Sequence, residues 1–203
     1  MDLLQGQLSE GLVDQLSQQL GGASKEQTAN AASGIMTTLM GALAKNASNP
    51  EGAQALNNAL ERDHDGSILD DVVGMLSGTQ SRSVQNERTM NGTGIIKHIL
   101  GDKTGNAIDM ISKMSGMEKG NTGNLMSILA PLVMGTLGKA KKQQGLDIGG
   151  LTSLLSGTVS AQQQKDPTMS LVTKFLDSDG DGSIIDDVAN LGMKFLGGLF
   201  KKK

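Results

Sequence analysis

The chain contains an internal repeat, and this repeat limits its possible folds more than any other feature. Three short motifs occur twice in the same order: V-D-x-L-S at 13–17 and I-D-x-I-S at 108–112, M-G-x-L-x-K at 40–45 and 134–139, and D-G-S-I-L-D-D-V at 65–72 and D-G-S-I-I-D-D-V at 181–188. The separation is 94 positions at the second motif and 116 at the third, which places about 22 extra residues somewhere in 140–165. We therefore predict a first helical repeat at 1–78, a linker at 79–93 and a second repeat at 94–203.

Apolar residues in both halves follow a helical period, and no stretch of the sequence alternates convincingly with period two. The helical stripes run through 3–20, 35–43, 99–114, 125–137 and 184–199. Gly21 and Gly22 end the first stripe, and the polar stretch from Ser24 to Gln27 is a suitable start for the next helix. With three Phe, no Trp and no Tyr, the core must consist of aliphatic residues and Met, which favours helix-on-helix packing. We predict an all-α fold, a duplicated helical bundle with EF-hand-like acidic helix-loop-helix corners.

Several methionines lie at helical spacing, at Met36 and Met40 and again at Met110, Met114 and Met117. Stripes of this kind occur in adaptable binding grooves, where flexible Met side chains accept different partners. Apolar neighbours three and four positions away favour the simpler interpretation that these side chains fill the core.

The composition argues against several classes of function. The chain has no Cys, which removes disulfides, Cys zinc sites and thiol chemistry, and only two His. Its net charge is -3, and the only basic run, Lys201–Lys203, is terminal, so we expect no binding to nucleic acid. The sequence lacks a phosphate-binding loop and a motif that would give His98 catalytic partners, and we expect no enzymatic activity.

The N-terminus lacks the basic and apolar regions of a secretory signal, and no segment has the roughly 18 continuous apolar residues of a membrane span. We expect a cytoplasmic location, with a specialised export route as the alternative.

The second copy of the third motif extends into an acidic loop with the spacing of an EF-hand. Carboxylates at loop positions one, three and five converge on one point when the chain turns tightly, and Gly182 at position six allows that turn. Val188 stands where a full EF-hand loop has a bidentate Glu, so one of the two preceding aspartates would close the coordination sphere. The predicted calcium ligands are Asp177, Asp179, Asp181, the Ser183 carbonyl, and Asp186 or Asp187.

The first copy is a weaker candidate for the same cation. Its predicted ligands are Glu61, Asp63, Asp65, Ser67, Asp70 and Asp71. Glu61 is long for the tight turn, and Arg62 and His64 bring positive charge close to it. A purely structural alternative exists for both loops, because Ser67 with Asp70, and likewise Ser183 with Asp186, resembles a helix capping box. Capping does not require three acids at alternate positions, and five Asp between 177 and 187 repel one another unless a cation neutralises them.

The sequence A-P-L-V-M-G-T-L-G at 130–138, together with D-S-D-G-D-G-S-I-I-D-D at 177–187, resembles the bacterial DUF937 family, also called YidB-like proteins. The C-terminal residues 192–200 are similar to the ends of some members. Counted through the repeat, the resemblance covers two tandem copies and most of the chain. It implies an all-helical fold and no established activity. The first copy departs from the pattern at Met36–Leu39, which lacks the Pro, and at Glu61, which replaces an Asp.

These observations favour a non-catalytic structural or protein-interaction protein, a scaffold or self-assembling unit whose corners bind calcium. The alternative is a membrane-docking or membrane-active protein, in which Phe195–Phe200 enters lipid and Lys201–Lys203 binds anionic headgroups. A calcium-responsive switch is a third possibility, although the loops lack the position-twelve Glu that drives helix opening in such switches.

Overall fold

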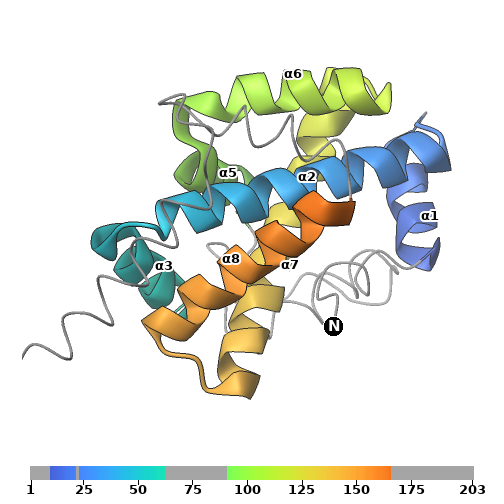
Figure 1. The fold of residues 1–203 in the computed structure, drawn as a ribbon. Coiled ribbons are helices and arrows are strands. Elements are labelled where there is room, and N and C mark those ends of the chain that lie inside the picture. Colours follow the sequence, from blue (N-terminus) through green and yellow to red (C-terminus); the bar gives the residue numbers. More distant parts are fainter. Residues whose placement is uncertain (1–9, 22, 63–90, 166–203) are drawn as a thin grey trace, which may run out of the picture.

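A computed structural model of the chain describes residues 10–21, 23–62 and 91–165, and every regular element in these ranges is a helix (Figure 1). The elements in order are α1 (Glu10–Gln19), α2 (Lys25–Asn46), α3 (Pro50–Arg62), α5 (Gly92–Leu100), the short 3-10 helix η1 (Gly101–Lys103), α6 (Thr104–Ser115), α7 (Lys119–Gln144) and α8 (Ile148–Lys165). The prediction of an all-α fold is confirmed for these ranges. Residues 3–9 of the predicted 3–20 stripe, and the whole 184–199 stripe, lie outside them.

Two long helices, α2 and α7, form the centre of the fold. Each has ten consecutive buried residues, Ile35–Ala44 in α2 and Leu129–Gly138 in α7. The two helices pack against each other, and α2 also packs against α6 on one side and α8 on the other (Figure 1). A helix enclosed in this way needs apolar or small residues all round, whereas a surface helix needs only one apolar stripe. The Gly, Ala and Thr between the larger residues of these segments meet that need.

The two predicted repeats share one hydrophobic core. A single cluster of buried residues includes Leu39 of α2, Leu60 of α3, Leu129 of α7 and Leu155 of α8. Neither half therefore buries its apolar residues alone. The predicted boundary at 78–94 falls outside the described residues except for its last positions, where α5 begins at Gly92.

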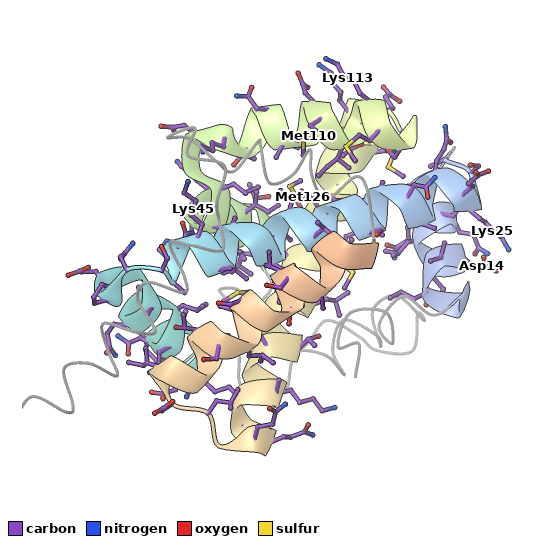
Figure 2. All side chains as sticks on the ribbon, viewed as in Figure 1. Asp14, Lys25, Lys45, Met110, Lys113 and Met126 are labelled. Carbon is purple, nitrogen blue, oxygen red and sulfur yellow. The ribbon has the colours of Figure 1, made fainter. Side chains whose placement is uncertain are left out.

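The methionine stripes mostly contribute to this core. Met36, Met40 and Met117 are each at most 5% exposed. Met110, labelled in Figure 2, is partly buried and packs on the core from α6. This placement agrees with core packing for these residues rather than with an open groove.

The predicted start of the second helix is confirmed at Ser24. Its hydroxyl accepts a hydrogen bond from the Gln27 backbone N–H (3.1 Å), and the Gln27 side chain accepts one from the Ser24 N–H (3.0 Å). This reciprocal capping box satisfies two backbone donors that the helix itself leaves without partners. The side-chain amide nitrogen of Gln27 (Nε2) also donates to the Gly116 carbonyl (2.7 Å), so the cap fixes α2 to the turn between α6 and α7.

The turn between α1 and α2 and the turn between α6 and α7 contain the same set of contacts. In each, an Asp on the first helix pairs with the Lys that begins the second: Asp14 with Lys25 (2.6 Å) and Asp109 with Lys119 (2.7 Å). Figure 2 shows the Asp14–Lys25 pair. In each, a Ser hydroxyl donates across the turn, Ser17 to the Ala23 carbonyl (2.8 Å) and Ser112 to the Met117 carbonyl (2.6 Å). Each turn also contains a glycine with a positive φ, Gly21 in the first and Gly116 in the second. A residue with a Cβ would be strained there.

Helices α3 and α8, the last described helices of the two halves, also begin in the same way. The Asn49 side chain accepts from the Gly52 N–H and the Asp147 side chain accepts from the Gly150 N–H, both at 2.7 Å. The backbone carbonyl of each of these two residues also accepts a helical hydrogen bond at 2.9 Å, from the N–H of Ala53 and of Leu151 respectively. Both residues thus act as helix N-caps.

Candidate cation loops and the Glu61 corner

Most of the predicted calcium ligands lie outside the described residues. This applies to Asp63, Asp65, Ser67, Asp70 and Asp71 of the first loop and to Asp177, Asp179, Asp181, Ser183, Asp186 and Asp187 of the second. Glu61 is the one predicted ligand that the structure describes. Helix α3 ends at Arg62, so Glu61 at the first position of the first loop lies in its last turn, and α8 ends at Lys165, twelve positions before Asp177. Within the described ranges no three acidic or His side chains gather closely enough to hold a metal ion.

Glu61 forms an ion pair with Lys141 across the ends of two helices. Its Oε1 atom accepts a hydrogen bond from the Lys141 Nζ at 2.8 Å and a second from the Asn57 side-chain amide at 3.2 Å. The Lys141 side chain is only 15% exposed, whereas that of Glu61 is 56% exposed. The hydrogen bond from the Lys141 ammonium, and then its charge, hold the pKa of the Glu61 carboxyl below its ordinary value.

The two helices position this corner through the core. Leu56 and Leu60 are buried and fix the face of α3 that packs on α7 and α8. Asn57 precedes Glu61 by four positions, which places the two side chains next to each other on the helix surface. Lys141 lies in the last turn of α7, where the helix dipole favours a cation.

The sequence did not point to Lys141, because it lies 80 positions from Glu61. The basic residues close to Glu61 in the sequence are Arg62 and His64 instead. Arg62 is exposed at the end of α3, and His64 lies outside the described residues. The other histidine, His98, is exposed in the last turn of α5.

No helix in the described part of the chain is both long and apolar enough to cross a membrane. The terminal residues 195–203, on which the predicted membrane contact depends, lie outside that part.

The family described as "Bacterial protein of unknown function (DUF937)" matches residues 2–140. The matched stretch crosses the predicted linker at 79–93 and ends within α7, so it does not separate two tandem copies. No curated protein and no solved structure matches the chain.

Proposed function

We propose that this chain, which belongs to the DUF937 family, is a non-catalytic scaffold or self-assembling protein made of two related helix triplets, each leading into an acidic calcium-binding loop. The family description assigns no function that could be transferred. The observation that carries the proposal is the pair of triplets, α1–α2–α3 and α6–α7–α8, with their matching turn contacts.

The matching contacts support duplication because they recur at a nearly constant separation. From Gly21 to Gly116 is 95 positions, and from Lys25 to Lys119 is 94. From the cap at Asn49 to the cap at Asp147 is 98. An ion pair, a crossing Ser hydroxyl and a positive-φ Gly that recur together are expected of two copies of one unit.

The same numbering bears on the extra residues predicted within 140–165. The separation rises by four positions between the start of α7 and the cap of α8. The separation reaches 116 positions at the acidic motifs. The rest of the extra residues are therefore located between the start of α8 and Asp181. In this proposal α8 is the counterpart of α3, and each triplet continues into one acidic loop.

A scaffold role is supported by how the chain uses its core. Both central helices are enclosed by other helices, so the two triplets share one hydrophobic core. A body with two related halves offers two related outer surfaces, which suits binding to repeated partners or to further copies of the chain.

Calcium titration tests the cation part of this proposal. We expect the second loop to bind Ca²⁺ more tightly than the first, with a Kd on the order of 10⁻⁵–10⁻³ M because the bidentate Glu is missing. Ligand that binds only the folded state stabilises it by about 2.7 kcal/mol at a hundredfold excess over Kd. Millimolar Ca²⁺ should therefore raise the melting temperature, and Asp179→Ala with Asp181→Ala should remove most of the increase. Identical melting curves in Ca²⁺ and in chelator would leave only the capping interpretation of this loop.

The scaffold part is tested by light scattering after size-exclusion chromatography, with and without Ca²⁺. Concentration must be followed by refractive index, because the chain has no Trp and no Tyr. Self-assembly predicts a mass above one chain that grows with protein concentration. A single-chain mass at every concentration would refute self-assembly and leave only a scaffold for other proteins.

A further inference from the structure

We propose that Asn91 is a self-modification site: its side chain deamidates with the Gly92 backbone nitrogen as the nucleophile, and the folded start of α5 keeps this reaction slow. Asn91 and Gly92 form the only Asn-Gly pair in the sequence. A glycine obstructs attack by its own nitrogen less than any other residue, because it has no Cβ. Asn91 is exposed and caps α5. The modification is separate from the proposed binding of calcium.

The reaction balances with water as its only co-reactant. The Gly92 nitrogen attacks the Asn91 Cγ atom, and the new N–Cγ bond closes a succinimide ring. The Cγ–Nδ2 bond breaks, and ammonia leaves with the proton of the Gly92 N–H. Water then opens the ring at one of its two carbonyl carbons. Attack at Cγ gives aspartate, whereas attack at the main-chain carbonyl carbon gives isoaspartate, in which the main chain continues through Cβ and Cγ.

The backbone conformation of Asn91 holds the reacting atoms apart. Ring closure requires the Gly92 nitrogen and the Asn91 Cβ to lie on the same side of the Cα–C bond. The Cβ of an L-residue is rotated about 120° from its backbone nitrogen around this bond. The Asn91 ψ of 74° therefore places the Gly92 nitrogen nearly opposite Cβ. Attack on Cγ requires the Asn91 ψ angle to rotate by almost half a turn.

Two hydrogen bonds at the start of α5 oppose this rotation. The Asn91 carbonyl accepts from the Ile95 N–H (3.0 Å), which fixes the peptide plane that contains the Gly92 nitrogen. The Asn91 Oδ1 accepts from the Gly94 N–H (2.9 Å), so the side chain lies over the first turn of the helix. Gly94 leaves room for it, since a Cβ there would lie 2.8 Å from Nδ2 and 3.0 Å from Cγ of Asn91. Deamidation therefore requires the loss of this cap.

The two products have different effects on α5. An aspartate at position 91 keeps the cap, because Asp and Asn are equally good N-caps and the helix N-terminus favours a negative charge. An isoaspartate adds a methylene group to the main chain directly before Gly92, which is buried where α5 packs on α7. It also displaces the carbonyl that accepts from the Ile95 N–H. Opening of this helix end is thus recorded as a permanent covalent change.

The experiment compares the deamidation rate of the full chain in its folded state with the rate in guanidinium chloride, at one mildly alkaline pH. Trypsin cleaves after Arg88 and Lys97, and mass spectrometry of the released peptide follows the replacement of the amide by a carboxyl group. The ratio of the unfolded to the folded rate measures protection and cancels intrinsic effects of sequence. Gly94→Ala displaces the Asn91 side chain. Thr93→Ala is the matched control, because Thr93 is exposed in the same helical turn.

We expect folding to slow the reaction of the parent chain at least about tenfold, because the helix end must open first. Gly94→Ala should lose about fivefold of this protection, the value of an N-cap hydrogen bond, and Thr93→Ala should keep it within about twofold. Equal rates in the folded and unfolded parent chain would overturn the proposal, as would no conversion of Asn91 in the unfolded chain. Equal protection in Gly94→Ala and the parent would also overturn it, because the cap would then not hold the side chain away.

Discussion

A close backbone approach between α5 and α7 leads to a sharp prediction at Gly92. This buried residue begins α5, and a Cβ placed on it would lie 2.6 Å from the carbonyl carbon and 2.9 Å from the Cα of Ser127 in α7, and closer still to the carbonyl oxygen. Ser127 is four positions before Pro131, which has no N–H to donate to it. Pro131 thus removes the helical partner of the carbonyl that faces Gly92, and α5 can approach α7 closely there.

Gly92→Ala should therefore destabilise the protein. The obstacle is backbone rather than a flexible side chain, so α5 must move away from α7, and such overpacking costs about 1–3 kcal/mol. For a chain of this length each kcal/mol lowers the melting temperature by about 2–4 °C. Gly157→Ala is the control: a Cβ there meets nothing within 4 Å. In a helix interior it should stabilise by about 0.5–1 kcal/mol.

Thermal unfolding followed by circular dichroism at 222 nm measures the melting temperature of both variants and does not depend on Trp or Tyr, which the chain lacks. We expect their melting temperatures to move in opposite directions. A Gly92→Ala variant as stable as the parent, or more stable, would show that α5 does not lie against the Ser127 carbonyl as described.

Three further predictions concern other parts of the chain. Glu61 has a lowered pKa in the folded state, so its contribution to stability is present above the ordinary glutamate pKa and is lost as pH falls through the folded value. The melting temperature of Glu61→Gln, measured as a function of pH, should lack that decline. Ser24→Ala should cost about 1 kcal/mol in urea unfolding, whereas Ser24→Asp, also a good N-cap, should keep most of the stability. The alternative membrane role predicts flotation of the chain with anionic liposomes and its loss when Lys201–Lys203 are changed to Gln, and the absence of flotation would remove that role.

The features that the sequence predicted correctly depend on local chemistry. A Ser followed three positions later by Gln is a sequence signature of a helix start, and Ser24 caps α2 in this way. The aliphatic composition and the helical period led to an all-α fold, because no aromatic or β-branched alternation was available for strands. The buried positions of Met36 and Met40 followed from their apolar neighbours three and four positions away.

The features that the sequence did not predict depend on contacts between distant segments. The partner of Glu61 lies 80 positions away, and nothing in the residues near Lys141 distinguishes it from Lys139 or Lys142. The sequence motifs also predicted one apolar stripe at 35–43, whereas α2 is buried on every side there. Whether a Gly, Ala or Thr on the far side of a stripe is buried depends on how many helices surround it, and periodicity contains no information about that number.

The position of α5 explains why the two central helices differ if they come from one unit. At the 94-position separation of the M-G-x-L-x-K motifs, Thr37 of α2 is the counterpart of Pro131 of α7. Both are buried, but only Thr37 has the backbone N–H that continues the helical hydrogen bonds. Helix α5 packs on α7 at the turn that Pro131 leaves open, with Gly92 at the closest point, and the Asn46 side chain donates to the Ile99 carbonyl to hold its other end to α2. A Pro at position 37 would remove a helical hydrogen bond within the buried part of α2. Duplication from one ancestral unit is therefore compatible with Pro in only one copy. Thr37→Pro should consequently cost about 3 kcal/mol or more in unfolding free energy, and a Thr37→Pro variant with parental stability would contradict this account of the asymmetry.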